Sequence, residues 1–305
     1  MNLLGSILYD TVYYSTPIVL CTLGGLFSYN ANVLNIGLEG MMLMGAFSGA
    51  LFTLMTGSIV AGMAIGVVAT CILGLIFSYL SVNLKSNFII TGFGINILVS
   101  ALSAFVLQYM QEANLNLSAI VDVNRLKINI PLIKDIPIVS NILSGHPALT
   151  YIAVLLVIAV YVILYKTKLG LYIRVVGENE DSAKSVGIKV GAIKYAAIII
   201  GAVLCALAGA NLSVERMGLY TNNMTAGRGF IALAAFYCGK GKPVKSTLFA
   251  MIFGLAQALS TSLSIYAGGI SGLLDAVPYL TMVIVLAVVS ATEIKHKKTR
   301  SFNIG

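Results

Sequence analysis

The segment IVAGMAIGVVATCILGLIFSYLSV, residues 59–82, decides the fold class, because none of its side chains is charged. A helix needs about 20 mostly apolar residues to cross the hydrocarbon core of a bilayer, and this segment is long enough by itself. The sequence around it is similar, since the first 84 residues contain only two charged side chains, Asp10 and Glu39. We therefore expect one transmembrane helix here and others on both sides of it.

The composition of the whole chain agrees with this expectation. Of 305 residues, 10% are charged and 58% are hydrophobic, and the mean hydropathy is +0.95. Soluble globular proteins carry about 25% charged residues. These values exclude an ordinary soluble enzyme, a disordered protein and a nucleic-acid-binding domain, despite a net charge of +8. We predict an all-α, polytopic transmembrane bundle that forms a single membrane domain over residues 1–305.

Apolar segments separated by polar residues give nine candidate spans, within a range of eight to ten. They lie at 11–28, 36–56, 59–82, 88–110, 149–166, 194–213, 225–239, 246–265 and 275–292. The 225–239 segment is too short to cross alone, so we expect half of a broken or re-entrant helix pair. Such backbone persists at membrane depth only where protein or a water-filled cavity covers it.

Positive residues set the orientation of membrane proteins, because they are retained on the cytoplasmic side. With nine spans, fourteen of the 19 Lys and Arg residues fall on one side, in the connections around Lys85, 167–193 and Lys240–Lys245 and in the tail. We therefore predict a cytoplasmic 167–193 loop, a cytoplasmic 293–305 tail and an external N-terminus. The long 111–148 connection is then external, and we expect it to form a partly ordered cap.

The most polar membrane segment is FSYNANVLNIGLEGMM, residues 27–42, which contains Asn32, Asn35 and Glu39. Polar residues between two spans are costly in a bilayer. One interpretation is a well-capped helix start, with Asn35 as the N-cap and Glu39 in the first turn. The other is a helix break that lines a solute pathway.

A second informative segment is RVVGENEDSAKSVGIKV, residues 174–190. It predicts a short helix with Asn179 as the N-cap and Gly187 at the C′ position. About seven residues are too few for a helix that is stable alone. Such a helix docks on another surface, unless the segment is a solvated loop with one helical turn.

The third segment is GRGFIALAAFYCGKGKP, residues 227–243, in which glycines bracket a short apolar helix. Its pattern is similar to that of residues 39–47, as expected for transporters built from repeated halves. A phosphate-binding loop is excluded, because no Gly precedes either Gly-Lys pair at the required spacing. The two histidines lie in a loop and the tail and the four cysteines are scattered, so we expect no metal site.

In matching order, these three segments resemble the permease subunits of bacterial ABC importers for simple sugars and nucleosides. This class includes ribose-type and branched-chain amino-acid-type permeases. The motifs are NIGLEGMM at 35–42, VGEN at 176–179 with Ala183 and VGI at 186–188, and GRGFIALAA at 227–235 with Gly239 and Pro243. The resemblance extends from about residue 15 to 292. It is strongest to the shorter of two paired permeases in nucleoside importers, such as those for guanosine.

The resemblance implies a non-catalytic transport subunit that itself binds no cofactor. The implied partners are a second, longer permease, a cytoplasmic ABC ATPase that uses ATP and Mg²⁺, and a lipoprotein receptor that binds the solute; membrane lipid surrounds the chain. The 178–190 segment would be the coupling helix that contacts the ATPase. The residues assigned to this contact are Glu178, Asn179, Asp181, Ala183, Lys184, Gly187 and Lys189. The acidic run at 178–181 departs from the Asn-Pro pairing usual in the family.

Nucleosides need aromatic surfaces for stacking and amide or hydroxyl groups for hydrogen bonds. On this basis we predict a substrate pathway lined by Phe27, Asn32, Asn35, Glu39, Phe88, Phe93, Asn96 and Phe230. A ribose-like sugar remains an alternative solute. A stand-alone channel or secondary carrier, and a membrane scaffold without transport, are the alternatives from other classes.

Overall fold

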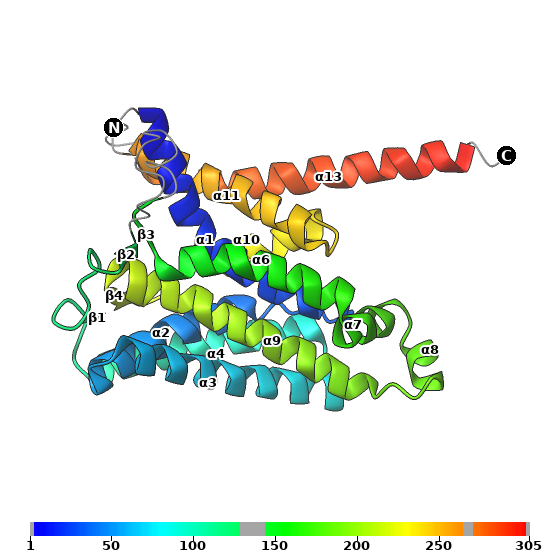
Figure 1. Cartoon of the computed structure of the whole chain (residues 1–305), viewed down its shortest axis with the longest axis horizontal. Coiled ribbons are helices and arrows are strands. Elements are labelled where there is room, and N and C mark those ends of the chain that lie inside the picture. The colour runs from blue at the N-terminus through cyan, green and yellow to red at the C-terminus, as the bar shows by residue number, and fades with distance from the viewer. Residues whose placement is uncertain (1–2, 129–143, 265–270, 303–305) are drawn as a thin grey trace.

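The computed structural model describes residues 3–128, 144–264 and 271–302, which are almost entirely helical (Figure 1). In its first half the helices are α1 Leu3–Asn30, α2 Leu38–Thr56, α3 Ile59–Ser78 with the π-helical extension η1 Tyr79–Asn83, α4 Phe88–Tyr109 and α6 Ala148–Lys166. In the second half they are α7 Lys168–Glu178, α8 Glu180–Ser185, α9 Val190–Ala210 with the π-helical extension η3 Asn211–Met217, α10 Arg228–Cys238, α11 Pro243–Ser264, α12 Ser271–Leu274 and α13 Val277–Phe302.

Each of the nine predicted apolar segments coincides with one of these helices. Among the described residues, seven helices are long and apolar enough to cross a membrane. They are α2, α3 with η1, α4, α6, α9 with η3, α11, and the 272–292 segment that ends within α13. Helix α1 has 28 residues but a more polar composition, and α10 has only 11. The prediction of a polytopic helical membrane protein is confirmed.

Helices α1, α2 and α9 form the centre of the bundle, and small residues let their backbones approach closely. A Cβ atom on Gly45 of α2 would lie 2.5 Å from Cα of Ala206 on α9. Gly62 of α3 is equally close to α2, since its Cβ would lie 2.5 Å from the backbone nitrogen of Thr53. Glycines at these positions therefore mark close helix contacts, as expected in lipid. Two of the scattered cysteines also meet here, with 3.7 Å between Sγ of Cys21 and Sγ of Cys205.

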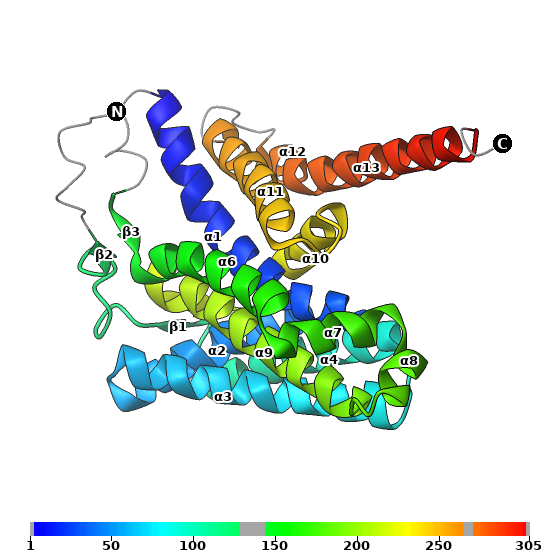
Figure 2. The same ribbon diagram turned by 45° about the vertical axis from the view of Figure 1, so that its right-hand side comes forward.

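The outer helices present large apolar side chains to the surroundings. Helix α4 exposes Ile90, Ile97 and Phe105, and α13 exposes Leu280 and Ile284. α13 lies along the edge of the molecule and extends well past the other helices (Figures 1 and 2). A bilayer solvates such side chains, so these faces are suited to contact with lipid.

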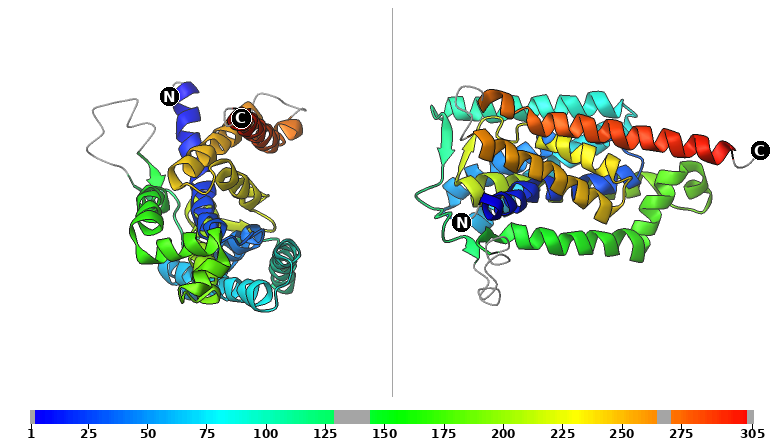
Figure 3. Two further views of the ribbon diagram at one scale, coloured as in Figure 1. Left: turned by 90° about the vertical axis from the view of Figure 1, so that its right-hand side faces the viewer. Right: turned by 90° about the horizontal axis from the view of Figure 1, so that it is seen from above.

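The lysine-rich connections gather at one end of the bundle. Asn30, at the end of α1, donates from Nδ2 to the carbonyl oxygen of Gly241 at 3.1 Å. Its own carbonyl oxygen lies against Gly177 in α7. Lys85 and Lys184 line a common cavity there. The N-terminus lies at the opposite end (Figure 3), so the charge pattern correctly groups the loops.

Short strands cover the end that lies opposite the lysines. β1 Asn114–Asn116 pairs antiparallel with β4 Leu219–Thr221, and β2 Lys127–Ile128 pairs with β3 His146–Pro147. The described parts of the 111–148 connection thus lie over this end of the bundle, where the sequence predicts a cap. Lys134 and Asp135 lie outside the described residues.

Candidate functional site: two helix starts and a cleft

The functional site is built where the N-termini of α2 and α10 meet inside the bundle. Each helix follows an irregular stretch, residues 31–37 before α2 and 222–227 before α10. The first turn of a helix leaves backbone N–H groups without intrahelical partners. Inside the bundle, these N–H groups need acceptors from other parts of the chain.

Glu39 supplies the acceptors for α10. Its Oε1 accepts a hydrogen bond from the Gly227 nitrogen at 2.8 Å, and its Oε2 accepts one from the Gly229 nitrogen at 2.6 Å. The side chain is buried, with 7% of its surface exposed. A carboxylate is stabilised by the positive end of the helix dipole as well as by these donors. Glu39 therefore begins α2 and caps α10.

Asn96 of α4 supplies the corresponding groups for α2. Its Oδ1 accepts from the Gly40 nitrogen at 2.7 Å, and its Nδ2 donates to the Ile36 carbonyl oxygen at 3.1 Å. The prediction of Asn35 as the N-cap of α2 is wrong by two positions. The N-cap is Gly37, which has no side chain to accept a hydrogen bond from the helix. Asn35 instead accepts from the Gly37 nitrogen and folds the approach to the helix.

Gly229 allows the two helix starts to approach. A Cβ atom at this position would lie 2.6 Å from Cα of Glu39 and 2.7 Å from its Oε2, so any side chain would displace the carboxylate from its donors. The preceding Gly227 has φ of +77°, which favours glycine. The glycines of the GRG motif therefore serve the junction directly.

A cleft of about 480 Å³ opens beside this junction. Four helices and the 222–227 stretch contribute polar or aromatic groups to its wall. These residues are Glu39, Asn96, Ser100, Asn223, Phe230 and Tyr279. The Phe93 and Phe230 rings lie 6.2 Å apart, and the Tyr279 hydroxyl donates to the Ala226 carbonyl oxygen. The cleft thus combines amide, hydroxyl and aromatic groups around one carboxylate.

The structure assembles only part of the predicted pathway. Glu39, Asn96 and Phe230 line the cleft, and Phe93 packs beside it. Phe27 is fully buried in the hydrophobic core, so its assignment is corrected, and Asn35 is buried as well. Asn32 is exposed just past the end of α1, and Phe88 lines a different cavity near α8. Their place in the pathway stays a prediction. Sequence reasoning missed Ser100, Asn223 and Tyr279, because their spacing along the chain gives no sign that they converge.

A second buried carboxylate has a similar structural role. Glu215 lies buried in η3. Its oxygens accept from the Leu149 nitrogen at the start of α6, at 3.2 and 3.3 Å, and from Asn211 Nδ2 at 3.0 Å. Both buried carboxylates among the described residues thus satisfy helix starts.

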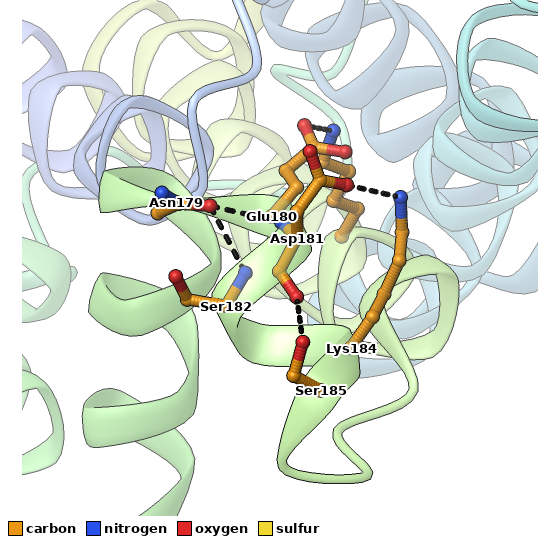
Figure 4. Close-up of polar contacts among 7 residues, drawn as sticks. Asn179, Glu180, Asp181, Ser182, Lys184 and Ser185 are labelled. Atoms are coloured by element: carbon orange, nitrogen blue, oxygen red, sulfur yellow. Dashed lines mark hydrogen bonds and ion pairs between the residues drawn. The ribbon is translucent and has the colours of Figure 1, made fainter.

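The predicted short helix at the lysine-rich end is confirmed as α8 (Figure 4). Asn179 Oδ1 accepts from the backbone nitrogens of Asp181 and Ser182, both at 3.0 Å. Lys184 Nζ lies 3.2 Å from Asp181 Oδ1. Gly187 follows the helix with φ of +82°, as expected at a C′ position. The sequence therefore predicted both ends of this helix.

The anchor of α8 is internal. Ala183 is fully buried and packs in one cluster with Val176 of α7 and Val190 of α9. The prediction that Ala183 contacts another protein is therefore corrected, because its side chain packs against α7 and α9 of the same chain. The other six predicted contact residues, Glu178, Asn179, Asp181, Lys184, Gly187 and Lys189, are exposed.

Comparison with known proteins decides the family. Residues 7–289 match the model of the branched-chain amino acid transport system / permease component family. The chain belongs to this permease family. The match includes both segments of the Glu39 junction and reaches into the last span.

Several named proteins are similar to this permease over most of their length. The nucleoside ABC transporter permease NupC of Lactococcus lactis subsp. cremoris is 33% identical, over 94% of this chain and 93% of that protein. The guanosine ABC transporter permease NupQ of Bacillus subtilis is 32% identical over 85% and 83%. The putative glucose ABC transporter permease TsgC13 of Haloferax volcanii is 33% identical over 94% and 92%. No solved structure matches the chain significantly.

Proposed function

We propose that this permease imports nucleosides across the cytoplasmic membrane as one subunit of an ATP-driven ABC transporter. The observation that carries the proposal is the cleft at the Glu39 junction, which unites stacking surfaces and neutral hydrogen-bonding groups. The similarity to NupC and NupQ over most of the chain supports the same solute class.

The wall of the cleft suits a neutral, planar solute with several hydroxyl groups. Phe93 and Phe230 offer apolar faces, and aromatic pairs of this kind can stack a nucleobase. Asn223 and Ser100 offer amide and hydroxyl groups that can bond to ribose or base edges. Glu39 keeps the wall in place, because its oxygens are engaged by α10.

The energy for transport would come from partner proteins. A cytoplasmic ATPase would hydrolyse ATP with Mg²⁺ and would contact the exposed residues of α8. A second, longer permease would complete the pathway. A lipoprotein receptor would deliver the solute. This arrangement places the lysine-rich end in the cytoplasm and the N-terminus outside.

Uptake of labelled solutes by cells with and without this chain tests the proposal. We expect the deletion strain to lose nucleoside uptake and to regain it when the gene is restored. Glucose and ribose belong in the same panel, since TsgC13 gives a specific reason to consider a sugar. Loss of sugar uptake with unchanged nucleoside uptake would show that the imported solute is a sugar and would contradict the proposed nucleoside. Nucleoside uptake by purified protein alone, without an ATPase, would instead indicate a channel or carrier.

A further inference from the structure

A second cavity, of about 400 Å³, lies at the lysine-rich end, away from the Glu39 cleft. Its wall comes from η1, the connection between η1 and α4, the first residue of α4, α8 and the start of α9. The lining includes Lys85, Lys184 and Lys194 but only one carboxylate, that of Glu180. The cavity is thus positively charged and its purpose is not explained by the solute pathway.

The carboxylates near this cavity neutralise it incompletely. Glu180 pairs with Lys194, whose side chain is only 9% exposed. Lys184 pairs with Asp181 on the surface, where both groups are largely exposed and the pair contributes little. Among the described residues, Lys85 has no ion pair. Its position is nevertheless fixed, because the Leu84 and Ser86 nitrogens donate to the carbonyl oxygens of Tyr79 and Leu80.

The start of α9 adds further positive potential. Val190 and Gly191, in its first turn, line the cavity, and the N-cap Lys189 makes no side-chain hydrogen bond to the helix. The N-terminus of a helix favours an anion through its dipole and its free N–H groups. The lysines and the helix start therefore point to the same kind of ligand, a phosphate group.

The location of the cavity identifies the source of that phosphate. Lys85 stands between two spans, α3 with η1 and α4, and thus at the membrane surface. Beside it, Leu84 and Ile90 are 58% and 73% exposed and face lipid. A phospholipid could lay its chains along these side chains while its headgroup enters the cavity. Basic clusters at a membrane surface attract anionic headgroups in this way.

We propose that this cavity binds the headgroup phosphate of an anionic phospholipid from the adjoining leaflet. The lipid then bridges the α3–α4 connection and α8. Because Glu180 and Lys184 belong to α8, a bound lipid restrains the position of this helix relative to the spans.

Lipid retention by the full-length protein in nanodiscs tests the site directly. Nanodiscs of phosphatidylcholine with a small fraction of photoactivatable phosphatidylglycerol would report crosslinking to the α3–α4 connection and α8. The test variant is Lys85→Gln with Lys184→Gln. The control is Lys242→Gln with Lys245→Gln, which removes the same charge from exposed positions at the same end.

A lysine near the membrane surface changes the affinity for anionic lipid by about fivefold. We expect the test variant to lose about 25-fold in affinity and the control to remain close to wild type. Equal loss in both variants, or no loss in either, would overturn the site. Displacement of the crosslink by millimolar inorganic phosphate would show a soluble anion as the ligand and overturn the lipid assignment.

Binding is measured here without transport, so the site and the nucleoside proposal can fail separately. Retained crosslinking together with absent nucleoside uptake would contradict the proposed solute only.

Discussion

At the scale of single residues, the carboxylate of Glu39 links two helices, since it begins α2 while its oxygens accept from the backbone of α10. Hydrogen bonds to a charged acceptor contribute about 1.5–3 kcal/mol each, more than neutral ones. Because Gly229 is buried, its nitrogen is left without a partner when this acceptor is lost. The start of α10, and with it the wall of the cleft, therefore depends on this side chain.

Replacing Glu39 with Gln tests this dependence. The amide has a single oxygen, so one of the two backbone donors loses its acceptor, at a cost of about 1–3 kcal/mol. We expect normal membrane insertion, a lower melting temperature in detergent and a loss of uptake of tenfold or more. The matched control is Glu112→Gln, because that carboxylate is exposed and is not assigned to the solute pathway or to the ATPase contact. Unchanged uptake and stability in Glu39→Gln would contradict the capping role.

Gly229 provides a steric test of the same junction. In Gly229→Ala the new methyl group would lie 2.6 Å from Cα of Glu39, and such overpacking costs about 1–3 kcal/mol. Gly94, on the exposed face of α4, has nothing within 4 Å of its Cβ position. We expect Gly94→Ala to retain stability and uptake and Gly229→Ala to lose both. Equal behaviour of the two variants would show that the close approach is unimportant.

The sequence predicts Glu39 but not its partner. A carboxylate between two apolar spans is unusual enough to be noticed. Its acceptors, however, serve a helix that starts 190 residues later, and no periodicity connects positions so distant. Tyr279 was missed for the same reason. Phe27 was assigned to the pathway for its ring alone, although aromatic side chains also fill cores, as this one does.

At the scale of elements, local sequence signals determine the ends of α8, whereas tertiary packing determines which of its faces is buried. Its N-cap and its C′ glycine are local features, so the sequence predicts both ends. Its buried face depends on α7 and α9, which the sequence does not place against Ala183. Because Ala183 anchors the helix from within, a substitution there would test folding rather than docking.

The exposed end of α8 gives a cleaner test of docking to an ATPase. Val186 is 72% exposed, so Val186→Glu should leave the fold intact while placing a charge in any apolar contact. We expect normal expression and thermal stability but at least a tenfold loss of ATP-driven uptake, since burying an unpaired charge is costly. Lys242→Gln makes the same change in net charge at the same end, away from α8, and should keep uptake. Normal uptake by Val186→Glu would contradict docking through this end of the helix.

At the scale of the whole molecule, the apolar pattern predicts the helices well because the bilayer imposes it on every span. The apolar pattern is weaker in helices that other helices shield from the bilayer, such as the more polar α1 and the short α10, because the bilayer does not constrain their side chains. The charge pattern predicts that the lysine-rich connections lie at one end of the bundle. Contacts such as the hydrogen bond from Asn30 to Gly241 show the same grouping independently. The assignment of that end to the cytoplasm rests on the positive-inside rule alone.

Cysteine labelling on intact cells tests this assignment. Thr56, at the turn between α2 and α3, is exposed at the end opposite the lysines, and Ser182 is exposed on α8. In a background with Cys71→Ala, since the other three native cysteines are buried, we expect a membrane-impermeant maleimide to label Thr56→Cys from outside. Ser182→Cys should react only after the cells are permeabilised. The reverse pattern would place the lysines outside, in conflict with the positive-inside rule, and would remove α8 from the reach of any cytoplasmic ATPase.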